Sequence, residues 1–250
     1  MSSLSYKFSD LYNAVAKFLG TYGSTGPTGA NLSDAKEVVN DAYSRFITGN
    51  GSYRWSFLEQ EDFLNTSTGV HTYQLPEGFE ALTHRFQFEN ESGYRAPVER
   101  SLDVIQALRA DGVATKAYPE VYSIQAGKYD KKFGQLFEVS FYPTPDTTYT
   151  FIYRYKFMPP KLEDDNDLPV GGPEMAGVLK QMCLAEAESQ KDKKAGVQEA
   201  KARDMIALAI ARDSARKPHI LGHNSDGNSM SYWHTARESW RVNNIYPDTQ

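Results

Sequence analysis

The feature that most constrains this chain is a change in the spacing of its apolar residues. In residues 1–50 and again in residues 173–217, apolar side chains recur every three or four positions, which aligns them on one face of an α-helix. In residues 51–160 they alternate with polar residues, a pattern typical of antiparallel strands with one buried face. The chain must therefore combine helices and a sheet.

The helical spacing predicts two helices near each end of the chain. "DLYNAVAKFLG" has Ser9 as its candidate N-cap and ends at Gly20, whereas "DAKEVVNDAYSRFITGN" has Ser33 as its cap and ends at Gly49. A third helix is expected after Pro173, and a fourth is expected over residues 195–216. Their predicted buried stripes are Met175, Val178, Leu179, Met182 and Cys183, and then Ala202, Met205, Ile206, Ala209 and Ile210.

Four stretches in the middle of the chain alternate in the manner of strands. They are "VHTYQL", "HRFQFEN", "QLFEVSFYP" and "YTFIYRYKF". We expect "PTPDTT" to join the last two as a hairpin-like connection. A short helix, "SLDVIQALRADG", is predicted between strands, with Ser101 as N-cap and Gly112 at its C-terminal end.

These elements predict an α+β fold with four parts. Neither helical pair can bury its stripes alone, so residues 1–50 and 173–217 are expected to form one small helical bundle. Residues 51–160 would be an inserted antiparallel β-rich domain, and residues 161–172 an acidic linker rich in Pro and Gly. Residues 218–250 show no period but carry large aromatic residues, which predicts an extended C-terminal arm that docks on another surface.

Composition excludes several classes of protein. The formal net charge of −5 argues against a non-specific nucleic-acid binder, because contacts with phosphate dominate such binding. Cys183 is the only cysteine, so neither an intramolecular disulfide nor a cysteine-based zinc site can form. We identify no secretory signal at the N-terminus and no apolar run long enough to span a membrane, and therefore expect no membrane partner.

No motif of catalysis or cofactor binding emerges, so we expect neither an enzyme nor a metal or cofactor. His219 and His223 are four residues apart, but Pro218 and Gly222 interrupt a helix there. The acidic run "EDDND" lacks the spacing of a calcium loop and is expected to be a solvated linker.

Two other functions stay open. In "YRYKF" the aromatic residues share one strand face and the cations the other, which favours a core role over a base-stacking platform. A tyrosine-rich β module that binds carbohydrate or single-stranded nucleic acid is nevertheless an alternative. A cell-wall glycan hydrolase is another, because two carboxylates can meet in space from any positions in sequence.

An ordered series of short signatures gives a more specific indication. It comprises "YRWSF", "YQLPEGF", "YPEVYSI" and "VSFYPTPDTTYTFIYRYKFMPPKL", between the helical pairs. The series resembles the head-to-tail adaptor (connector) proteins of tailed bacteriophages, of the tail-tubular-protein-A type. The resemblance implies a structural virion protein that forms a ring, usually of twelve copies, at the portal vertex neck. Its implied partners are further copies of itself, the portal protein, a tail tube or nozzle protein and, transiently, double-stranded DNA passing through the channel.

The resemblance also assigns roles to residues. Trp55 and Phe57 would fix the start of the β-rich insert onto the helical bundle, and Leu75 and Pro76 would end a strand, since proline cannot continue a ladder. These four form the predicted domain joint. The arm would bind the portal, and assembly would take place in the host cytoplasm. The arm residues that we expect to make this contact are Ile220, Trp233, Trp240, Ile245 and Tyr246.

Overall fold

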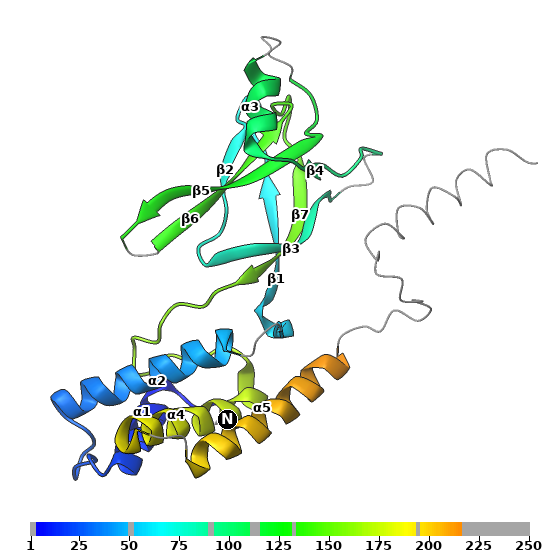
Figure 1. Cartoon of the computed structure of the whole chain (residues 1–250). Helices are drawn as coiled ribbons and strands as arrows, with labels where there is room; N and C mark the ends of the chain where they lie inside the picture. Colours follow the sequence, from blue (N-terminus) through cyan, green and yellow to red (C-terminus); the bar gives the residue numbers. More distant parts are fainter. Residues whose placement is uncertain are drawn as a thin grey trace, which may run out of the picture. The chain divides into compact units, whose positions relative to one another are not determined.

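The computed structural model describes most of the chain, with short gaps (Figure 1). The described residues are 4–49, 53–89, 93–110, 116–131, 134–193 and 196–216. Residues 1–214 form one compact unit, and a second begins at Ala215. Helices lie near both ends of the described sequence and strands lie between them, which confirms the predicted α+β class.

The long helices bury their apolar faces in one shared cluster, the helical core. The helices are α1 (Phe8–Leu19), α2 (Ala30–Thr48), α4 (Gly172–Asp192) and α5 (Val197–Arg216). The predicted stripe of α4 is buried. The predicted stripe of α5 also faces the core: Ala202 and Ala209 are buried, and Met205, Ile206 and Ile210 pack against the core partly buried. The two ends of the chain therefore do pack together. The larger buried members of the core are Phe8, Leu11, Phe46, Trp55, Leu58 and Leu179.

The predicted serine caps of the first two helices are wrong. α1 begins at Phe8 with Lys7 as its N-cap, because the Asp10 carboxylate accepts the Lys7 N–H at 3.0 Å and makes a Ser9 cap unnecessary. α2 begins three residues before Ser33, after Gly29, whose φ of 58° suits glycine. The predicted C-terminal ends hold, since α1 is followed by Gly20 and α2 by Gly49.

The acidic segment before α4 keeps most of its side chains exposed, as expected of a solvated linker, and its backbone also contacts the helices. Carbonyls of Asp165 and Asp167 accept hydrogen bonds from the first turn of α1 at 3.1 and 2.9 Å. The Lys36 ammonium lies 2.9 Å from the Asp165 carboxylate and lowers the pKa of that group. Leu162 is buried, and its backbone exchanges two hydrogen bonds with the Asn40 side chain. A polar segment can pack here because the neighbouring helices offer unpaired N–H groups and a lysine.

The strands form two sheets. One has the order β1-β7-β3 and is antiparallel throughout, and the other has the order β2-β6-β5-β4, in which only the short β4 runs parallel to its neighbour β5. A single-turn helix, η1 (Ser56–Leu58), precedes the first strand. The strands are β1 (Glu59–Asn65), β2 (Thr72–Gln74), β3 (Phe79–Phe88), β4 (Val98–Glu99), β5 (Val121–Asp130), β6 (Gly134–Tyr142) and β7 (Thr150–Phe157).

The predicted hairpin between the last two strands does not form. β6 and β7 lie in different sheets, so the "PTPDTT" segment crosses from one sheet to the other. Phe141 of β6 and Phe151 of β7 stack with ring centroids 5.0 Å apart, and Phe86 of β3 contacts both rings. Alternation identified the aromatic face that is buried in β3, β6 and β7, but β1, β4 and β5 were not predicted as strands. It carried no information about whether two such faces would lie side by side or opposite each other.

The remaining elements match the prediction in part. The helix α3 (Leu102–Ala110) follows Ser101 as expected, whereas Gly112 lies outside the described residues. The strand predicted over "VHTYQL" is shorter and covers only Thr72–Gln74. The aromatic face of β7 is buried as predicted, at Phe151, Tyr153 and Tyr155.

Candidate functional site

α5 is the last described helix, and the residues of the predicted arm follow it in sequence. It ends at Arg216, and residues 217–250 lie outside the described part of the chain. Ala202 and Ala209 are buried, and Met205, Ile206 and Ile210 pack partly buried against the helical core. Polar contacts join α5 to its neighbours as well.

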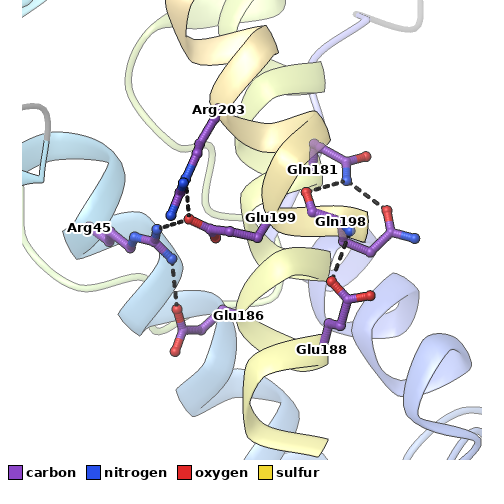
Figure 2. Close-up of polar contacts among 7 residues, drawn as sticks. All are labelled: Arg45, Gln181, Glu186, Glu188, Gln198, Glu199 and Arg203. Carbon is purple, nitrogen blue, oxygen red and sulfur yellow. Dashed lines mark hydrogen bonds and ion pairs between the residues drawn. The ribbon is translucent and has the colours of Figure 1, made fainter. Parts of the chain in front are cut away.

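Glu199 is the centre of one polar group, the Glu199 cluster, formed with Arg45, Glu186 and Arg203 (Figure 2). Its carboxylate accepts from the Arg45 guanidinium at 2.5 Å and from Arg203 Nε at 3.1 Å. The second Arg45 nitrogen lies 3.5 Å from Glu186 of α4. Glu199 is only 7 % exposed, and the hydrogen bond from Arg45 lowers the pKa of its carboxyl. The Arg45 side chain of α2 thus forms ion pairs with both α4 and α5.

The first turn of α5 is fixed to α4 by a second set of hydrogen bonds, also drawn in Figure 2. The Glu188 carboxylate accepts from the Gln198 N–H at 2.8 Å, which satisfies an N–H group that has no partner within the helix. The Gln181 amide donates to the Gln198 backbone and side chain at 3.2 and 2.7 Å. A side chain at Gly196 would overlap the Glu188 carboxylate, so glycine allows this close approach.

Asp213 forms the second anchor near the other end of α5, and we call its contacts with Tyr53 and Ser56 the Asp213 latch. The Tyr53 hydroxyl donates to Asp213 Oδ2 at 2.6 Å, and the Ser56 N–H donates to the same oxygen at 3.0 Å. The Ser56 hydroxyl donates to Oδ1. Asp213 is 3 % exposed, and burial together with the bond to Asp213 raises the pKa of Tyr53 to about 12. The latch joins α5 to the segment that leads into β1.

The four predicted joint residues do not lie in one core. Trp55 is fully buried in the helical core, and its indole N–H donates to the Phe46 carbonyl at 3.1 Å. Phe57 is half-buried and stacks on Trp55 with centroids 5.4 Å apart. Leu75 instead belongs to the core between the sheets, and Pro76 follows one residue later, after the end of β2. The structure therefore brings Trp55 and Phe57 together.

The five predicted portal-contacting residues of the arm lie outside the described residues, and so do His219 and His223. They are Ile220, Trp233, Trp240, Ile245 and Tyr246. Their contact with the portal stays a prediction.

Sequence reasoning missed both anchors of α5, although the pattern contained a signal for them. Glu199 and Asp213 stand at the same helical phase as the stripe Ala202, Ile206 and Ala209, with spacings of three and four residues. Acidic residues in phase with a buried stripe need partners, because an unpaired buried charge is strongly unfavourable. The partners Arg45 and Tyr53 come from distant segments and were not identifiable from local sequence.

Several alternative sites receive no support from the described residues. Tyr153 and Tyr155 are buried in the core, so they cannot act as an open stacking platform. Among the described residues, no group of three or more His, Cys, Asp or Glu side chains is placed to hold a metal ion. In the same part of the chain, no helix combines the length and apolarity needed to cross a membrane.

Comparison with known protein families identifies the chain's family. A protein-family model described as SU10 adaptor protein matches residues 6–222, which include every described helix and strand. The search of curated proteins returned no match.

Proposed function

The chain belongs to the SU10 adaptor protein family, and we propose that it is a head-to-tail adaptor, of the tail-tubular-protein-A type, that forms a ring between the portal and the tail. A phage adaptor is a structural protein. The ring would contain about twelve copies, as such adaptors usually do, and genome DNA would pass through its channel. The observation that carries the proposal is the extent of the family match, which runs from the start of α1 to beyond the end of α5.

The proposed partners follow from this position. The ring would bind the portal protein on one side and a tail tube or nozzle protein on the other, at the portal vertex neck of the virion. Assembly would take place in the host cytoplasm. Imaging of the purified chain by electron microscopy, alone and with portal protein, tests the proposal. We expect rings, or monomers that assemble on the portal, and a monomer that ignores the portal would contradict it.

The C-terminal arm is the proposed portal-binding segment. Its proposed contacts are Ile220, Trp233, Trp240, Ile245 and Tyr246. Two observations support this assignment: the large apolar residues occur without helical or strand period, and α5 is anchored at both ends just before the arm begins. An arm that leaves from a fixed point searches a smaller volume for its partner, which lowers the entropy lost on binding.

Truncation after Lys217 tests the arm. The described helices and strands form their cores from residues before Lys217, so the shortened chain should fold with the same thermal midpoint and lose portal binding. A full-length variant with Trp233→Ala and Trp240→Ala should also bind weakly, because aromatic residues dominate interface energies. Asn243→Ala with Asn244→Ala is the matched control and should bind normally. Undiminished portal binding by the truncated chain would exclude the arm as the portal-binding segment.

Trp55, Phe57, Leu75 and Pro76 are proposed to hold the junction between the helical and β-rich parts. The burial of Trp55 and its stacking with Phe57 support this role for these two residues.

We further propose that channel-facing surfaces of the ring are acidic or neutral, because the chain carries a net charge of −5 and a basic channel would retard DNA. A density map of the neck that shows a continuous basic lumen would contradict this.

A further inference from the structure

The outer end of the β5–β6 ribbon is stabilised by few strand contacts. β6 pairs with β2 only over Glu138 to Ser140, and β4 pairs with β5 only at its start. Among the described residues, the part of the ribbon beyond Ala126 and Phe137 therefore contains two strands only (Figure 1). A two-stranded ribbon is marginally stable in water by itself. A partner that covers it would account for its length.

The side chains at the ribbon tip are suited to binding an acidic partner. Tyr129 is 72 % exposed, and it lies close to Lys128 and Lys131, which are both exposed. Tyrosine is enriched at protein interfaces because its ring is apolar and its hydroxyl forms hydrogen bonds. Among the described residues, the tip thus presents one large aromatic ring, the positive charges of Lys128 and Lys131 and the half-buried carboxylate of Asp130. We call Lys128, Tyr129 and Lys131 the basic tip.

A complementary surface lies at the edge of the other sheet. β1 pairs with β7 on one side and is an edge strand of its sheet. Next to it is a hollow of about 410 Å³, the β1 groove, whose apolar walls include Phe63 and Pro76. Phe63 is 51 % exposed. The charged residues lining the groove are Asp62 and Glu77, so it carries negative charge and no cation.

We propose that the basic tip of one copy docks into the β1 groove of a second copy of this chain. Tyr129 would contact Phe63 and Pro76, and the two lysines would face the carboxylates of Asp62 and Glu77. Complementary charge favours a second copy of this chain as the occupant of the groove. The tip and the groove have net charges of opposite sign, and each has an apolar residue at its centre.

The symmetry of this contact follows from its two unlike surfaces. Because tip and groove are different parts of the chain, the contact is head-to-tail, and repeating it generates a closed ring or an open filament. The inference thus rests on the proposed function and specifies a contact between neighbouring copies in the ring.

Charge reversal in the full-length chain tests the contact, with self-association measured by sedimentation velocity and by imaging on portal protein. Lys131→Glu and Glu77→Lys should each weaken association at least about tenfold, because each places like charges opposite one another. The double variant K131E/E77K should recover much of the loss. Lys201→Glu and Glu37→Lys make the same charge changes at exposed sites elsewhere and serve as controls.

Disulfide cross-linking gives an independent readout of the same contact. Chains with Tyr129→Cys should cross-link to chains with Glu77→Cys when the two are mixed, and neither variant should cross-link alone. The native Cys183 is buried and does not interfere. If the wild-type chain forms rings and binds portal while K131E and E77K behave as wild type, the inference is overturned and the proposed function stands. If the wild-type chain neither associates with itself nor binds portal, both this inference and the proposed function are overturned.

Discussion

Ser56 and Asp213 are 157 residues apart in sequence and share two hydrogen bonds. The Ser56 N–H donates to Oδ2 of Asp213 at 3.0 Å, and the Ser56 hydroxyl donates to Oδ1. Ser56 opens the short helix before β1, whereas Asp213 lies in the last turns of α5. The contact thus connects the start of the β-rich region to the helix that precedes the arm, and most of the predictions below concern the attachment of that helix.

Asp213→Ala should destabilise the chain by about 1–3 kcal/mol, because it removes the buried carboxylate that accepts hydrogen bonds from the half-buried Tyr53 and Ser56. For a chain of this size that corresponds to a fall of roughly 2–4 °C in Tm for each kcal/mol. Thermal unfolding followed by circular dichroism measures the effect. Asp204→Ala is the matched control, since Asp204 is exposed on the same helix and should change Tm little. Equal Tm values for the two variants would show that the latch does not stabilise α5.

Glu199→Gln should make stability less dependent on pH in the acidic range. Arg45 lowers the pKa of the folded-state carboxyl below its unfolded value of about 4.3, so the contribution of the charged form is complete above that pH. It is lost as the pH falls through the folded-state pKa. Denaturant titrations should therefore show that the difference in unfolding free energy between wild type and variant shrinks as the pH falls below about 5. Glu37→Gln, at an exposed site, should track wild type throughout.

The thiol of Cys183 should react with a disulfide reagent only after the helical core opens. Burial raises the pKa of this thiol to about 12, so at pH 8 it is both protonated and inaccessible. Labelling at pH 8 should be slow in buffer and fast in denaturant. A Ser33→Cys variant supplies an exposed thiol on α2 that should react at once under the same conditions. Rapid labelling of native Cys183 would mean that α4 leaves the core readily.

Phe141→Ala should cost about 3–5 kcal/mol, because it removes a fully buried ring from the contact between the sheets. Phe63→Ala removes the same side chain from an exposed position on β1 and should change the unfolding free energy by less than about 0.5 kcal/mol. Denaturant unfolding measures both. The pair also separates stability from association, since Phe63→Ala should weaken docking into the β1 groove without weakening the fold.

Local sequence predicted the types of element and their buried faces well. The stripe of α4 and the aromatic face of β7 are buried as expected, since side-chain period directly reflects which face is apolar. The serine cap of α1 was wrong because the helix begins earlier, where the Asp10 carboxylate accepts the Lys7 N–H and the acidic segment accepts the N–H groups of Phe8 and Ser9. The helical parts at the two ends were correctly joined, because neither could bury its stripe alone.

The sequence by itself determined that this chain is α+β and which face is buried in the long helices and in β3, β6 and β7, because these properties depend on spacing along the chain. Only the tertiary structure decided that β6 and β7 enter different sheets and that Arg45 and Ser56 anchor α5. Those outcomes depend on pairings between distant segments. Many pairings bury the same apolar faces, and the one adopted is distinguished by the packing of rings such as Phe141 and Phe151 and by the partners available to buried Glu199 and Asp213.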